Sequence, residues 1–193
     1  MTATSLNWRA QRTDAAALRI LDAAEALYAT HGVDGVTMRD LAVAAGCSRA
    51  TLYRYFPSRE AVQAAFVDRS ADRLAHEVDA AGSAGDPGDR LVAAVTVALR
   101  LVRGNPAFAN WFRSDGVATA AQLAVVSPAI ESLARGFVAG LRGAEPAGAV
   151  SGSDAERARW LVRVMLSLLT TPGTDPDDEA QMLRTFVVPV VVG

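Results

Sequence analysis

Residues 36–60 read VTMRDLAVAAGCSRATLYRYFPSRE and constrain the fold more than any other part of the chain. Thr37 and Asp40 have the spacing of a capping box, in which each side chain bonds the backbone amide of the other at a helix start. Gly46 supplies the left-handed residue that ends this helix, and Ser48 is the N-cap of a second one. The segment therefore predicts two short helices joined by a glycine turn.

This arrangement has the spacing of a helix-turn-helix, whose second helix enters the major groove of DNA with its N-terminal residues at the base edges. From 41 to 59 there is no acidic side chain, whereas three arginines and two tyrosines are present. A surface that meets phosphate excludes carboxylates and is rich in arginine and hydroxyl donors. An ordinary pair of amphipathic core helices is the alternative, but it does not explain the acid-free run.

The motif assigns roles to particular side chains. Arg49 at the helix start is suited to guanine, and the methyl groups of Ala50 and Thr51 to the thymine methyl. We expect Arg59 to hold a backbone phosphate, and Arg9 and Arg12 to reach phosphate or the minor groove from an N-terminal arm. The predicted DNA-binding residues are Thr37, Arg39, Ser48, Arg49, Ala50, Thr51, Tyr53, Arg54, Tyr55 and Arg59.

Residues 18–62 resemble the TetR/AcrR family of transcriptional regulators, most specifically in the run TLYRYFPSRE at 51–60. Cys47 stands where the family usually has valine and Arg59 where it usually has lysine, and both keep the physical character of the site. The resemblance implies an all-α fold of about nine helices. An N-terminal three-helix DNA-binding domain would span 1–60, and a C-terminal helical bundle for effector binding and dimerisation would span 61–193.

The bulk composition agrees with such a protein. The 193 residues are 51% hydrophobic and 21% charged, which is typical of a globular chain. Residues 1–60 carry seven arginines and six acids, for a net charge of +1, and 61–193 carry twelve arginines and fifteen acids, for −3. One cysteine, no signal peptide and no apolar run of membrane-spanning length predict a cytoplasmic protein without a membrane partner.

Most of the chain after the motif reads as helix, without an alternating strand pattern or an internal repeat. Glycine and proline predict loops at 80–89 and 143–152. We expect helices at about 14–31, 90–103, 128–141 and 153–170, a short one beginning with Phe108, and a last one that starts at Asp175. The valine-rich 187–192 is strand-like in composition, but we expect it to be a helix end packed on the body.

The sequence lacks the signatures of an enzyme. No His, Cys or carboxylate pair has metal-ligand spacing, and no phosphate-binding or nucleophile motif occurs. We therefore predict no catalytic residue, no metal and no cofactor. An enzyme or scaffold that uses a helix-turn-helix only for packing remains an alternative, which would lack salt-sensitive DNA affinity.

Large apolar side chains on several helices of the C-terminal part could line a cavity for a small, largely apolar effector. Simple core packing is the alternative for each of them, and the identity of an effector cannot be read. Three polar residues beside the aromatic cluster, Arg103, Asn110 and Arg113, are candidates to orient a polar end. The predicted effector-binding residues are Arg103, Phe108, Trp111, Phe112, Phe137 and Met165.

The last two predicted helices carry apolar stripes that a monomer would bury only in part. The family resemblance implies that they form a four-helix bundle with their copies across a two-fold axis. Wholly intramolecular packing is the alternative. The predicted interface residues are Trp160, Leu161, Val164, Leu168, Leu183 and Phe186.

Together these features predict a ligand-responsive repressor that binds a palindromic double-stranded DNA operator as a homodimer. The two recognition helices would lie about 34–36 Å apart, or a multiple of that distance. An activator, or a regulator that needs no effector, is the alternative that the sequence leaves open.

Overall fold

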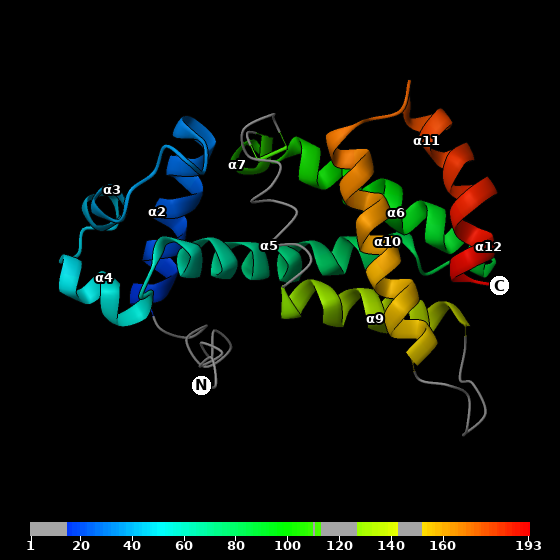
Figure 1. The fold of residues 1–193 in the computed structure, drawn as a ribbon, viewed down its shortest axis with the longest axis horizontal. Coiled ribbons are helices and arrows are strands. Elements are labelled where there is room, and N and C mark those ends of the chain that lie inside the picture. The colour runs from blue at the N-terminus through cyan, green and yellow to red at the C-terminus, as the bar shows by residue number, and fades with distance from the viewer. Residues whose placement is uncertain (1–14, 110, 113–126, 143–151) are drawn as a thin grey trace.

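The computed structural model describes residues 15–109, 111–112, 127–142 and 152–193, and it contains helices and no strand within these ranges (Figure 1). The predicted all-α class is confirmed. The molecule is elongated, with a small head of three helices at one end and a larger helical body at the other (Figure 1).

Three helices form the head, and local capping explains the two shorter ones. The Thr37 hydroxyl accepts a hydrogen bond from the Asp40 amide at 3.3 Å, and the Asp40 carboxylate accepts one from the Thr37 amide at 3.0 Å. Gly46 has a φ of +62°, and Ser48 caps the following helix through the Thr51 amide at 3.1 Å. The predicted helix-turn-helix is present. Its helices are α2 (Ala15–His31), α3 (Met38–Ala44) and α4 (Arg49–Tyr55).

A single long helix, α5 (Arg59–Ala81), runs from the head into the body (Figure 1). Ser58 caps its start by accepting from the Ala61 amide at 3.2 Å. Its first turns contribute Val62 and Phe66 to the core of the head. The proposed domain boundary after residue 60 therefore falls at the start of a helix that belongs to both parts.

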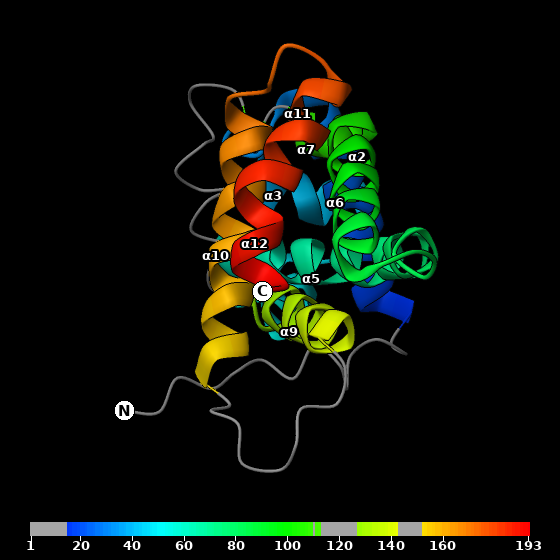
Figure 2. The ribbon, with the colours of Figure 1, turned by 90° about the vertical axis from the view of Figure 1, so that its right-hand side faces the viewer.

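The remaining helices surround the far half of α5. Figure 2 shows α10 and α12 side by side at the end of the molecule remote from the head, with α9 beneath them. The body comprises α6 (Pro87–Gly104), α7 (Pro106–Ala109), α9 (Pro128–Arg142), α10 (Gly152–Thr170), α11 (Pro176–Met182), the π-helix η1 (Leu183–Val187) and α12 (Val188–Val191).

The described residues form two hydrophobic cores, one in the head and one in the body. The core of the head ends in an aromatic cluster in which the rings of Tyr28, Phe66, Phe108 and Trp111 lie 5.0–5.9 Å apart. Burial raises the pKa of the Tyr28 phenol, so this group stays protonated. Because Phe108 and Trp111 come from the α7 region, the body supplies part of the core of the head.

Several helix boundaries differ from the prediction. The loop expected at 80–89 ends earlier, because Asp86 accepts from the amides of Gly88 and Asp89 and starts α6 at Pro87. The helix expected at about 153–170 begins at Gly152. Phe108 lies inside α7, and Trp111 follows this short helix rather than belonging to it.

The first helix and the C-terminal segment each show one further detail. Leu18 on α2 is exposed, although most of the large apolar residues of this helix are buried. The valine-rich C-terminus is helical, as expected, and buries Val187 and Val191 in the body. Pro189 cannot donate to the carbonyl four residues before it, and the wider π turn of η1 lies just ahead of this proline.

Candidate nucleic-acid interface and effector cavity

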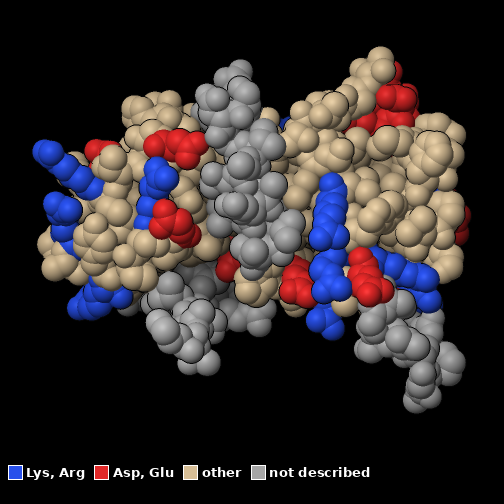
Figure 3. Space-filling view, viewed as in Figure 1, with Lys and Arg blue, Asp and Glu red and all other residues tan. Residues whose placement is uncertain are grey.

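The recognition helix α4 is anchored by one side chain and otherwise faces outward. Leu52 is wholly buried against the core of the head, whereas Arg49, Ala50, Tyr53 and Arg54 are exposed. Four of the predicted DNA-binding side chains therefore share a solvent-facing surface. In Figure 3, arginine side chains project from the end of the molecule formed by α3 and α4.

Two pairs of side chains on α4 orient each other. The hydroxyl oxygens of Ser48 and Thr51 lie 2.9 Å apart, so the N-cap also positions the half-buried Thr51. The guanidinium of Arg54 donates to the Tyr55 hydroxyl at 3.3 Å and lies 5.0 Å from the centre of the Tyr55 ring. Such pairing reduces the rotamer freedom that DNA binding would otherwise have to remove.

The other predicted contact residues flank α4. Thr37 and Arg39 are exposed at the start of α3, where the Thr37 hydroxyl donates to Asp40 at 2.6 Å. These hydrogen bonds from Thr37 hold the pKa of Asp40 below its usual range. Arg59, expected to hold phosphate, is half-buried and donates to the Asp34 carbonyl at 3.2 Å. Arg59 therefore also ties the start of α5 to the loop before α3.

Sequence reasoning missed one exposed residue of the helix-turn-helix. Val43 on α3 is 75% exposed, the largest exposure among the described large hydrophobic residues. The helical period places Val43 on the side of α3 opposite the buried Leu41 and Ala42. The sequence alone does not show, however, whether an exposed valine has a function, because single apolar residues are common on protein surfaces. An aliphatic side chain there is suited to a sugar or a thymine methyl.

The body contains an apolar cavity of about 220 Å³. Helices α5, α6, α9 and α10 form its walls, together with the segment that includes α7. Five of the six predicted effector residues, namely Phe108, Trp111, Phe112, Phe137 and Met165, line it. The predicted cluster of large side chains thus borders a cavity, while Phe108 and Trp111 also belong to the core of the head.

Arg103 is the exception, and its position corrects the expectation that it orients an effector. Its guanidinium donates to both carboxylate oxygens of Glu179, at 2.7 and 2.9 Å, and to the Leu168 carbonyl at 2.9 Å. These hydrogen bonds join α6 to α10 and α11, and the Arg103 side chain does not line the cavity. The other two polar candidates, Asn110 and Arg113, lie outside the described residues, as do Arg9 and Arg12.

The predicted interface residues divide into two groups. Leu161, Leu168 and Leu183 are at most 4% exposed and belong to the core of the body, so they have no surface to offer a partner. Leu161 also lines the cavity. Phe186 is 66% exposed and its neighbour Val190 48%, whereas Trp160 and Val164 are half-buried. The expectation for the three leucines is therefore corrected, because Leu161 and Leu168 on α10 and Leu183 on η1 all face into the body.

Other kinds of site are not evident in the described part of the chain. There, no group of three or more His, Cys, Asp or Glu side chains is arranged to hold a metal ion. The same residues include no helix with the length and apolar character needed to cross a membrane.

Comparison with known proteins agrees with this architecture. The family profile "Bacterial regulatory proteins, tetR family" matches residues 20–66. The uncharacterized HTH-type transcriptional regulator Rv1255c of Mycobacterium tuberculosis is 44% identical over 183 residues, which cover 94% of this chain and 88% of that protein. The chain therefore belongs to the TetR family of DNA-binding transcriptional regulators.

Solved structures share the fold. The TetR-family repressor AlkX of Dietzia sp. strain DQ12-45-1b, implicated in biodegradation of n-alkanes, aligns with a TM-score of 0.64 and 22% identity over 91% of this chain and 96% of that one. RolR in complex with resorcinol aligns with a TM-score of 0.62 and 19% identity over 96% and 91%. At these identities the likeness shows the common fold.

Proposed function

We propose that this TetR-family regulator is a repressor that binds a palindromic operator as a homodimer and leaves it when a small, largely apolar molecule occupies the cavity. The observation that carries the proposal is the pairing of two features along α5. An exposed, acid-free recognition helix lies at one end, and an apolar cavity lies at the other.

The DNA-binding part rests on the surface of α4. Arg49 stands at the first position of the helix, where a recognition helix brings side chains to base edges. Arg54 and Tyr53 are exposed farther along and are suited to phosphates on either side of the groove. Arg59 at the start of α5 would add a further phosphate contact, and its bond to the Asp34 carbonyl holds the loop before α3.

The effector part rests on the cavity. Preformed apolar cavities between helices are usual ligand sites, and aromatic walls give an apolar molecule large contact area. RolR, which shares the fold, was solved with resorcinol, and AlkX is implicated in n-alkane biodegradation. The link of AlkX to n-alkanes supports a small apolar molecule as the class of effector, and RolR shows that a protein of this fold holds a small aromatic ligand.

Communication between the two sites has a direct route. Phe108 and Trp111 line the cavity and also pack on Tyr28 and Phe66 in the core of the head. A ligand that displaces these rings therefore changes the packing of α2 against α5. Release of DNA requires that the ligand binds one arrangement of the heads more tightly than the other.

The homodimer rests on exposed apolar side chains. One recognition helix reads only a few base pairs, so a specific operator needs two heads related by a two-fold axis. Phe186 on η1 and Val190 on α12 are exposed, and α12 lies beside α10 at the end of the body (Figure 2), so both side chains are suited to the centre of such an interface. Trp160 and Val164 on α10 would extend it.

Selection of binding sites from a random pool of double-stranded DNA tests the DNA-binding part. We expect a palindrome whose affinity falls steeply with salt. Arg49→Ala is expected to cost about 1–3 kcal/mol of specific binding and to relax preference at one base position. Arg59→Ala is expected to weaken all sequences nearly equally, and Arg100→Ala, an exposed arginine on α6, serves as the control.

A regulator that needs no effector, or an activator, is the second candidate. The exposed helix α4 supports it as well as the first, because the surface of α4 does not depend on the cavity. A reporter gene placed behind the selected operator distinguishes repression from activation. Addition of apolar ligands to the preformed complex with DNA then shows whether release depends on the cavity.

A further inference from the structure

The cavity follows one face of α5. The described lining residues of this helix recur at intervals of three and four positions from Val67 to Asp79. At a rise of about 1.5 Å per residue, this stretch is about 18 Å long. A volume of about 220 Å³ spread over such a length leaves a narrow cross-section. The cavity is therefore elongated along α5.

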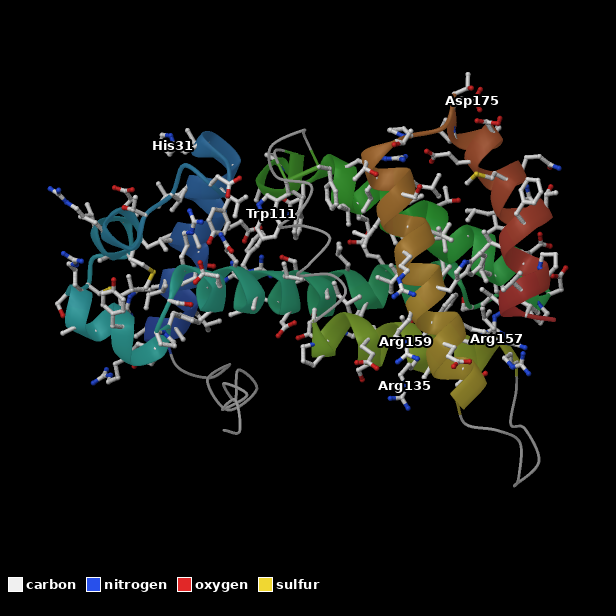
Figure 4. The ribbon with its side chains drawn as sticks, in the orientation of Figure 1. His31, Trp111, Arg135, Arg157, Arg159 and Asp175 are labelled. Carbon is white, nitrogen blue, oxygen red and sulfur yellow. The ribbon has the colours of Figure 1, made fainter. Side chains whose placement is uncertain are left out.

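Helix α9 lies beside this stretch of α5 (Figure 1) and contacts it near both ends of the cavity. At the end toward the head, the Ser127 hydroxyl donates to the Asp68 carboxylate at 2.6 Å. Figure 4 shows Trp111 on this side, where the α7 region approaches α5. At the end remote from the head, the Phe137 ring lies against Gly82. Phe137 is also the last residue of α9 that lines the cavity, so the α9 wall ends with this ring.

Gly82, the C-cap of α5, lies behind this wall. A Cβ at Gly82 would be 2.8 Å from Cε2 of Phe137 and 3.2 Å from the Cβ of Ala94. Phe137 and Ala94 line the cavity, whereas Gly82 does not. The φ of Gly82 is −87°, outside the left-handed region, so an added side chain would act through space and not through backbone strain. The missing side chain therefore gives the Phe137 ring room to stand back from the cavity.

We infer that the cavity takes an unbranched apolar chain laid along α5, and that Gly82 sets the longest chain that fits by leaving room for the Phe137 ring. This inference rests on the proposed function and specifies the shape of its ligand. Phe137 touches the ligand, and Gly82 is a positioning residue that acts through Phe137. A broad molecule does not suit the narrow cross-section, because it would have to part α9 from α5.

Ordinary packing at the end of α5 is the alternative explanation of the contact between Gly82 and Phe137. In that case Gly82→Ala changes stability and leaves the preferred length of the ligand unchanged. If Gly82 instead positions Phe137, the displaced ring occupies the end of the cavity and shortens the longest chain. The dependence of affinity on chain length therefore separates the two explanations.

A homologous series of ligands tests the inference. Affinities of the full-length protein for the 1-alkanols from hexanol to dodecanol, which differ only in the length of the apolar chain, are measured by isothermal titration calorimetry. We expect affinity to rise about fourfold for each added methylene that is buried, and to level off at a limiting length.

Two substitutions should move this limit in opposite directions. Gly82→Ala should lower it, so that the longest alcohols bind at least about fourfold more weakly, the loss of one buried methylene. Phe137→Ala should raise it. In the Phe137→Ala background, Gly82→Ala should leave the limit unchanged, because the ring through which it acts is absent. Gly140→Ala on α9, where an added Cβ meets no atom within 4 Å, is the control and should keep the limit of the original protein.

Each other outcome is decisive. If Gly82→Ala leaves the limit unchanged, or lowers it equally without the Phe137 ring, the inference is overturned while the effector role of the cavity stands. An affinity that does not rise beyond hexanol also overturns it, because the cavity then does not hold an extended chain. If no alcohol binds, the inference fails, and release of the operator by apolar ligands of other shapes decides the effector role separately.

Alcohols that bind with the expected limits but do not release the operator would support the inference and contradict the effector role. Far-ultraviolet circular dichroism and affinity for the selected operator show that each variant is folded.

Discussion

The guanidinium of Arg69 on α5 and the carboxylate of Glu25 on α2 form an ion pair with an Nη2–Oε2 distance of 2.8 Å. The same guanidinium donates to Asp22 at 2.7 Å and to the Leu21 carbonyl at 2.9 Å. The Arg69 side chain is only 7% exposed. This pairing fixes the first helix of the head to the central helix, one residue before Ser70 in the cavity wall.

Removal of this clamp is expected to destabilise the protein. Arg69→Ala removes the only buried cation that the described residues supply to the Glu25 and Asp22 carboxylates, and the side-chain donor from the Leu21 carbonyl, so we expect the free energy of unfolding to fall by about 2–3 kcal/mol. Arg73 also bonds Glu25, at 2.9 Å, but is 53% exposed, and Arg73→Ala should cost less than about 1 kcal/mol. Urea denaturation measures both. Equal losses of unfolding free energy in the two variants would show that burial of Arg69 does not strengthen its ion pairs.

The pair of Arg103 and Glu179 predicts a dependence of stability on pH. Hydrogen bonds from Arg103, followed by one from the Gly173 amide, hold the pKa of Glu179 below its ordinary value of 4.5. A lowered pKa in the folded state means that the stabilisation is present above pH 4.5 and is lost as the pH falls through the folded value. Glu179→Gln should therefore destabilise the protein at pH 7, and by less at pH 4.

Arg103→Met is the matched variant, because it removes the donor of the ion pair and keeps the Glu179 carboxylate. Its cost should shrink in the same way as the pH falls, because protonated Glu179 no longer needs the cation. A Glu179→Gln cost that is the same at pH 7 and pH 4, measured by chemical denaturation, contradicts the assignment.

Two glycines give opposite predictions for the same substitution. Gly46 ends α3 with a φ of +62°, where an added Cβ meets no atom within 4 Å but the backbone is strained for any L-residue. Gly46→Ala should cost about 1–2 kcal/mol. Gly136 lies inside α9 with open space around it, and Gly136→Ala should stabilise by about 0.5–1 kcal/mol. Thermal or chemical denaturation of both variants shows the sign, and stabilisation by Gly46→Ala would contradict the turn geometry.

Signals that depend on neighbouring residues were readable from the sequence. The caps at Thr37, Ser48 and Asp175 place three helix starts, because each side chain bonds amides two or three residues away. Asp86 is the same kind of cap, but the surrounding glycines suggested a loop. The aromatic lining of the cavity was predicted from the size and grouping of the side chains.

Signals that depend on tertiary packing were not readable. Arg103 and Glu179 are 76 positions apart, and no local pattern joins them. Leu183 points inward and Phe186 points outward, although both lie within one turn of the π-helix η1. The 3.6-residue period from which an apolar stripe is predicted does not hold in a π-helix.

The exposed end of the body predicts how the dimer can be broken without loss of the fold. Phe186 is 66% exposed in the monomer, so Phe186→Glu should leave the subunit folded. The variant places a charge at the centre of the proposed interface, and the two-fold axis places a second one opposite it. We expect light scattering to show a monomer and operator affinity to fall at least tenfold, with α4 unchanged. Leu183→Glu, by contrast, should unfold the subunit, because Leu183 is wholly buried. Leu18→Glu, which charges an exposed leucine on α2, controls for the added charge and should remain dimeric. A Phe186→Glu variant that stays dimeric and binds the operator normally would place the interface on another face.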